Sequence, residues 1–116
     1  MPQTHLDDAV LQALQDVMAE EFPQLLETFI ADSEERLASL RSGLAEADGA
    51  GLRLTAHSFK GSCGNMGAPV LVSLCKQVED AARQDDLAQV AVLLEQLERE
   101  FAIVRILFKG TRRPLA

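Results

Sequence analysis

Apolar residues recur every three or four positions along almost the whole chain, and no stretch of it alternates with a period of two. This spacing places apolar side chains on one stripe of an α-helix, so it predicts helices and argues against a β-sheet. Glycine and proline, which interrupt helices, gather at a few short breaks between the stripes. With 116 residues, the chain is long enough for one domain with a modest core.

The stripes and breaks together predict five helices, at residues 4–18, 20–47, 50–66, 68–84 and 85–108. Asp85 is the expected N-cap of the last helix, and Gly67 is the expected left-handed stop of the third. The apolar stripe of the first helix is predicted to consist of Leu6, Val10, Leu14 and Val17. Four long helices with short connections favour an all-α fold, an antiparallel four-helix bundle whose end is covered by the short N-terminal helix. Residues 1–108 would form the single domain, and residues 109–116 a flexible basic tail.

Charge and hydropathy exclude several classes of protein. The net charge of −7 argues against a nucleic-acid partner. No apolar run approaches the ~18 residues of a membrane span, and the acidic start lacks a secretory signal, so a cytoplasmic protein is expected. Cys63 and Cys75 are then expected to be reduced and buried, and their spacing does not suit a metal site.

His57 lies on the side of its predicted helix that faces away from the apolar stripe. At about 100° per residue, the histidine points opposite the apolar face of this helix. That face is formed by Leu52, Phe59, Cys63 and Met66. An ordinary core histidine, with its ring nitrogens satisfied by buried neighbours, fits this position poorly.

The helix surface around His57 combines basic residues with glycines. Its neighbours, three, four or seven positions away, are Arg53, Lys60, Gly61 and Gly64. Each glycine inside a helix costs about 1 kcal/mol relative to alanine, and a domain of this kind has only roughly 5–15 kcal/mol of stability. The cost is explained if a partner must approach the helix backbone closely at this face.

Such a surface suits a residue that accepts a phosphoryl group. An exposed imidazole is mostly neutral at cytoplasmic pH, so one ring nitrogen has a lone pair available for attack. Lys60 would stabilise the anionic phosphoryl group by its charge. Positioning and electrostatics contribute most of the catalysis in phosphoryl transfer, so few other groups are needed.

The residues after His57 resemble the signature of histidine-containing phosphotransfer (HPt) domains: histidine, any residue, leucine, lysine, glycine, serine, and then glycine-alanine. This chain has His57-Ser58-Phe59-Lys60-Gly61-Ser62 and later Gly67-Ala68. Downstream matches to the family pattern are Leu71, Cys75, Glu79 and Arg83. Phe59 departs from the usual leucine but remains apolar. The resemblance covers nearly the whole chain and is strongest to the stand-alone bacterial members of the HptB type.

The resemblance implies a phosphohistidine on Nε2 of His57, with Lys60 beside the phosphate and Glu79 bonded to Nδ1. It implies that a receiver-domain aspartate of a hybrid sensor kinase donates the phosphoryl group and that the receiver of a response regulator accepts it. Mg²⁺ would be bound by the receiver, so the chain itself would need no cofactor and would be a carrier rather than an enzyme. The family is mostly monomeric.

Several residues are expected to contact the receiver. The acidic pocket of a receiver suits the surface formed by Arg53, Gly61, Gly64 and Arg83. The resemblance also implies an apolar docking patch near the ends of the first two helices, with Met18 and Phe22 as candidates. Ordinary core packing of these two residues is an equal alternative.

Two other functions remain open on the sequence. The bundle would serve as a non-catalytic adaptor if its bare face bound a receiver or another signalling domain without phosphorylation of His57. A purely structural bundle is the weaker alternative, because it leaves the two glycines beside an exposed histidine unexplained. A sensor-kinase dimerisation domain is disfavoured, since no acid and no following proline accompany the histidine and no ATP-binding motif is present.

Overall fold

Every regular element between residues 4 and 112, the part of the chain that the computed structural model describes, is a helix. The elements are α1 (Asp8–Met18), the 3-10 turn η1 (Ala19–Glu21), α2 (Phe22–Ala45), α3 (Gly49–Asn65), α4 (Pro69–Arg83) and α5 (Leu87–Arg112). None of the helices in this part of the chain combines the length and the hydropathy needed to cross a bilayer.

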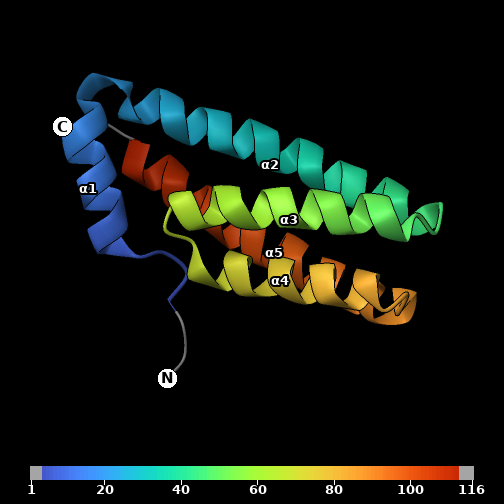
Figure 1. The fold of residues 1–116 in the computed structure, drawn as a ribbon. Helices are drawn as coiled ribbons and strands as arrows, with labels where there is room; N and C mark the ends of the chain where they lie inside the picture. The colour runs from blue at the N-terminus through green and yellow to red at the C-terminus, as the bar shows by residue number, and fades with distance from the viewer. Residues whose placement is uncertain (1–3, 113–116) are drawn as a thin grey trace.

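The four long helices run alternately up and down, and α1 crosses the end of the bundle at which α2 begins (Figure 1). α3 packs against α2 and α4, and α5 packs against the same two helices from the other side, so α3 and α5 occupy diagonal corners. The predicted antiparallel four-helix bundle with a short N-terminal helix is therefore confirmed.

The apolar stripes of the long helices form one continuous core. Leu26 of α2, Phe59 of α3, Leu71 of α4 and Leu94 of α5 are completely buried. The stripe predicted for the first helix is partly wrong, because Val17 is 82% exposed and Leu11 is buried instead. α1 contacts only one end of the bundle. Which of its side chains are buried therefore depends on how α1 crosses that end, and its apolar pattern alone does not predict it.

The helix ends that differ most from the sequence prediction are the start of α1 and both ends of α5, whereas the ends of α2, α3 and α4 differ by only one or two residues. α1 begins at Asp8 rather than at Thr4, because the Asp7 carboxylate caps it by accepting hydrogen bonds from the N–H groups of Ala9 and Val10. The predicted cap at Asp85 is wrong, since that residue has φ +56° and the Asp86 carboxylate accepts from the N–H of Gln89. α5 continues to Arg112, so residues 109–112 of the predicted tail are helical, and residues 113–116 lie outside the described part.

The segment before α1 is held against the bundle at two points. His5 Nδ1 lies 2.7 Å from Oε2 of the buried Glu100 of α5. The Asp7 N–H donates to the carbonyl oxygen of Gly67, 2.7 Å away, in the turn between α3 and α4. Gly67 has φ +66°, as its predicted role as a helix stop requires. This segment thereby joins α5 to the α3–α4 turn.

We expect both cysteines to be inert in the folded chain. Cys63 and Cys75 are free and completely buried on facing helices. A hydrogen bond with Cys75, together with burial, holds the pKa of the Cys63 thiol far above its ordinary value. A thiol titration with Ellman's reagent should detect neither cysteine in buffer and both in concentrated urea. Rapid reaction of one thiol in buffer would contradict this packing.

Candidate functional site

His57 stands in the middle of α3 and points away from the bundle core. Its side chain is 66% exposed, whereas Ala56 and Phe59, on the other face of the helix, are completely buried. These buried neighbours fix the rotation of α3 about its axis, so the imidazole faces outward. The orientation predicted from the helical wheel is therefore confirmed.

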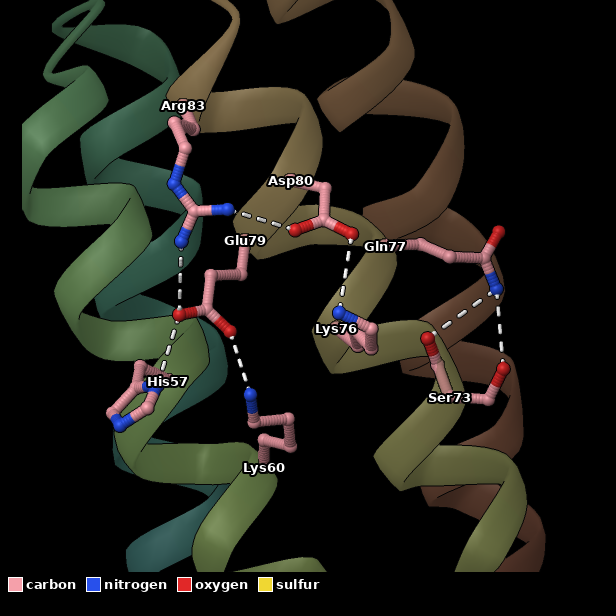
Figure 2. A network of polar contacts seen from close by, with 8 residues as sticks. All are labelled: His57, Lys60, Ser73, Lys76, Gln77, Glu79, Asp80 and Arg83. Atoms are coloured by element: carbon pink, nitrogen blue, oxygen red, sulfur yellow. Dashed lines mark hydrogen bonds and ion pairs between the residues drawn. The ribbon is translucent and has the colours of Figure 1, made fainter.

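A buried carboxylate on the adjacent helix holds the imidazole. Glu79 of α4 is 7% exposed, and its Oε2 lies 2.9 Å from Nδ1 of His57. Its other oxygen, Oε1, accepts a hydrogen bond of 2.8 Å from Nζ of Lys60. Figure 2 shows the carboxylate between these two side chains of α3, with the second nitrogen of the imidazole turned away from it. One acidic side chain of α4 thus contacts both His57 and Lys60 of α3.

The charge of Glu79 decides which nitrogen of His57 carries a proton. The hydrogen bond from Lys60, followed by that from His57, holds the pKa of Glu79 below its ordinary value, and these contacts outweigh the opposing effect of burial. An ionised carboxylate can only accept hydrogen bonds, so Nδ1 must be the donor. In the neutral ring, the lone pair is consequently on Nε2, which is the outer nitrogen.

Further basic residues surround this pair. Arg83 lies 3.6 Å from the same oxygen of Glu79 that His57 contacts and donates a hydrogen bond of 3.0 Å to Asp80 (Figure 2). Arg53 is exposed on α3, one turn before His57, and lines a shallow cavity of about 260 Å³ together with Arg83. Their exposure means that these charges contribute little to stability and remain accessible to a partner.

The two glycines on this face are not required by the packing of the bundle. A Cβ atom at Gly61 would have no neighbour within 4 Å, and one at Gly64 would make an ordinary contact of 3.8 Å with Val72. Neither residue is among those with a positive φ. Alanine would therefore fit at both positions, so the packing of the bundle gives no reason for glycine there.

The two residues predicted to form an apolar docking patch, Met18 and Phe22, are less exposed than that role requires. Phe22 is only 3% exposed and belongs to the core, so its assignment to a docking surface is wrong. Met18 is half-buried and packs against the same core. Both residues lie where α1 meets α2, and their burial follows from α1 folding over that end of the bundle.

Two features of the site were missed by reasoning from sequence. Lys60 contacts Glu79 rather than projecting freely, a pairing that requires knowledge of the packing between α3 and α4. Leu54, three residues before His57, is 66% exposed. The helical wheel already places Leu54 on the outer face, so its exposure was available from the sequence pattern.

We expect the contribution of Glu79 to stability to depend on pH. A carboxylate whose pKa is lowered by folding stabilises the fold above its unfolded pKa, and loses that contribution as the pH falls through its folded pKa. Glu79→Gln should therefore lower the free energy of unfolding by roughly 1–3 kcal/mol near pH 7, measured by urea denaturation. The difference from the wild type should shrink towards about pH 3. A difference that is the same at both pH values would contradict an ionised Glu79.

Substitution of Gly61 tests whether the fold requires glycine there. Because the added methyl group meets no neighbour, Gly61→Ala should raise the free energy of unfolding by up to about 1 kcal/mol. Gly67→Ala is the matched control, because a Cβ atom there would lie 2.9 Å from Val10 at a positive φ, and it should be destabilising. Loss of stability in Gly61→Ala, again measured in urea, would show that the bundle itself needs this glycine.

Comparisons with known proteins agree with this geometry. A family model described as the Hpt domain matches residues 24–105, which include His57, Lys60 and Glu79. The solved structure of histidine-containing phosphotransfer protein B (HptB) from Pseudomonas aeruginosa is similar at 56% sequence identity and a TM-score of 0.92, with 96% of each chain covered. No curated protein sequence matches the chain. The family match and this similarity together show that the chain belongs to the Hpt domain family and is a histidine phosphotransfer protein of phosphorelays.

Proposed function

We propose that this chain carries a phosphoryl group on Nε2 of His57 between two receiver domains. The donor would be the aspartyl phosphate of a hybrid sensor kinase, and the acceptor an aspartate of a response regulator. One observation carries the proposal: an exposed imidazole has its Nδ1 fixed by a buried, ionised carboxylate. This leaves Nε2 as the nucleophile, pointing towards an incoming partner.

The transfer step exchanges one bond to phosphorus for another. The lone pair of Nε2 forms the N–P bond while the P–O bond to the receiver aspartate breaks, and the departing carboxylate keeps that electron pair. The imidazole ring then bears a positive charge, because Nδ1 retains its proton. The Glu79 carboxylate, 2.9 Å from Nδ1, stabilises this charge. Transfer to the second receiver is the reverse sequence, with a different aspartate as the acceptor.

Lys60 has two anions within its reach during this step. In the unphosphorylated chain, its Nζ donates to Glu79, and its long side chain is 27% exposed. Because the phosphoryl group adds a dianion one helical turn away, Lys60 can turn outward to stabilise it. Arg83, 3.6 Å from Oε2 of Glu79, then remains as a positive charge next to the buried carboxylate.

The chain would act as a carrier rather than as an enzyme. The bare surface over Gly61 and Gly64 lets the receiver approach the backbone of α3. Arg53, Lys60 and Arg83 place positive charge where the acidic pocket of a receiver would lie. Mg²⁺ would be held by the receiver, so we propose no cofactor for this chain.

The test is transfer of radioactive phosphate from a phosphorylated receiver domain in the presence of Mg²⁺. Receiver domains of hybrid sensor kinases from Pseudomonas aeruginosa are the natural first donors, given the similar HptB of that organism. The wild-type chain should gain up to one acid-labile phosphate per molecule, and His57→Gln should gain none. His5→Gln is the matched control, because His5 is the other histidine of the chain and also contacts a buried glutamate, and it should be labelled like the wild type.

Either of two results would contradict the proposal. Label on His57→Gln would place the phosphate on another residue. Binding of receivers without any label on the wild-type chain would instead support a non-catalytic adaptor.

A further inference from the structure

Leu54 is a large apolar side chain that α3 leaves exposed beside the phosphoacceptor. Its exposed fraction is 66%, and no other large apolar residue of α3 is exposed. A single exposed leucine is common on protein surfaces and means little alone. This one lies one helical turn from His57, on the face that any donor of a phosphoryl group must cover.

The hydrogen bonds of α3 show what lies on each side of Leu54. His57 and Lys60 both reach α4 through Glu79. Ser58 points the other way, because its Oγ accepts a hydrogen bond of 3.2 Å from Nη2 of Arg36 on α2. Leu54 is three residues before His57 and four before Ser58, so it stands on the ridge between the α4 side and the α2 side.

A groove with an acidic wall runs along the α2 side. A cavity of about 460 Å³ opens between α2 and α3, with Leu54, Thr55 and Ser58 on its α3 wall. Its α2 wall includes the exposed carboxylates of Asp32 and Glu35 and the half-buried guanidinium of Arg36, so the wall has two negative charges and one positive charge. On the opposite side of the ridge lie Lys60 and Arg83. The exposed charges therefore change sign across His57, from the carboxylates of Asp32 and Glu35 over α2 to the basic groups towards α4, while the Arg36 guanidinium on the α2 side is half-buried and donates to Ser58.

We propose that the groove between α2 and α3 receives an apolar side chain of the receiver domain that is flanked by lysine or arginine. This inference rests on the proposed function and adds the orientation of the receiver. The acidic pocket of the receiver, with its Mg²⁺, lies over Lys60 and Arg83, and a basic, partly apolar segment packs on Leu54 beside Asp32 and Glu35. The opposite orientation would place acidic groups of both proteins against each other, which is unfavourable.

The same charges make a second copy of this chain a poor occupant of the groove. The chain has a net charge of −7, and α2 contains four acidic and two basic residues, so self-association through the groove would bring like charges together. A receiver segment with an apolar side chain beside a basic one can instead pair with the carboxylates of the α2 wall and pack against the exposed Leu54.

The first test compares two exposed apolar residues. Leu54→Ser should lower the second-order rate constant of transfer from the receiver about tenfold, as expected when a central apolar anchor is lost. Ile106→Ser is the matched control, because Ile106 is 69% exposed and lies on α5, at the corner diagonal to α3, and its rate should stay within twofold of the wild type. Phosphoramidate, a small phosphodonor, should label His57 equally in both variants and in the wild type.

The second test removes the negative charges of the α2 wall while keeping side chains of nearly the same shape. Asp32→Asn with Glu35→Gln should slow transfer several-fold at low salt and flatten the dependence of the rate on ionic strength. Glu20→Gln with Glu21→Gln changes the net charge equally at exposed positions away from the groove, and should retain the dependence of the wild type.

The two proposals fail in different ways. If the receiver does not label the wild-type chain, the proposed function fails. If the wild type is labelled and Leu54→Ser transfers as fast as Ile106→Ser, the groove is not part of the docking surface. Faster transfer after neutralisation of Asp32 and Glu35 would also overturn the inference, because it would mean that an acidic segment of the receiver faces the groove.

Discussion

The site depends on one carboxylate, that of Glu79, which is buried between α3 and α4. A buried charge is unfavourable unless it is paired, and Glu79 obtains its partners from the neighbouring helix. Its two oxygens contact His57 and Lys60, so a single side chain fixes the tautomer of the imidazole and the resting position of the lysine. The proposed nucleophile, His57, therefore requires α3 and α4 to pack in one register, with one rotation of each helix about its axis.

The core of the bundle maintains that register. Phe59 and Cys63 of α3 and Cys75 and Val78 of α4 are completely buried, within one helical turn of the site residues on their own helices. A slip of either helix by one residue would turn these side chains towards solvent and move Glu79 away from the imidazole. Close packing in the core therefore fixes the positions of His57, Lys60 and Glu79 relative to one another.

Much of this could be predicted from the sequence, because it follows from helical periodicity. The outward direction of His57 needed only the positions of Phe59 and Cys63 on a wheel. Helix ends were less predictable, since adjacent acids such as Asp85 and Asp86 are both good caps and the backbone decides between them. The burial of Phe22 agrees with the core packing that the sequence offered as an equal alternative. The pairing of Lys60 with Glu79 depends on contacts between separate helices, for which one sequence carries no local signal.

The placement of the site within packed helices has a consequence for the proposed carrier function. His57, Lys60 and Glu79 all lie within helices whose opposite faces are packed in the core, so no loop or hinge positions any of these three side chains. If the chain acts as the carrier proposed above, it would store the phosphoryl group without committing it to one destination. The flow of phosphate should then follow mass action, with its direction set by the abundance of each receiver and by how quickly each loses its phosphate.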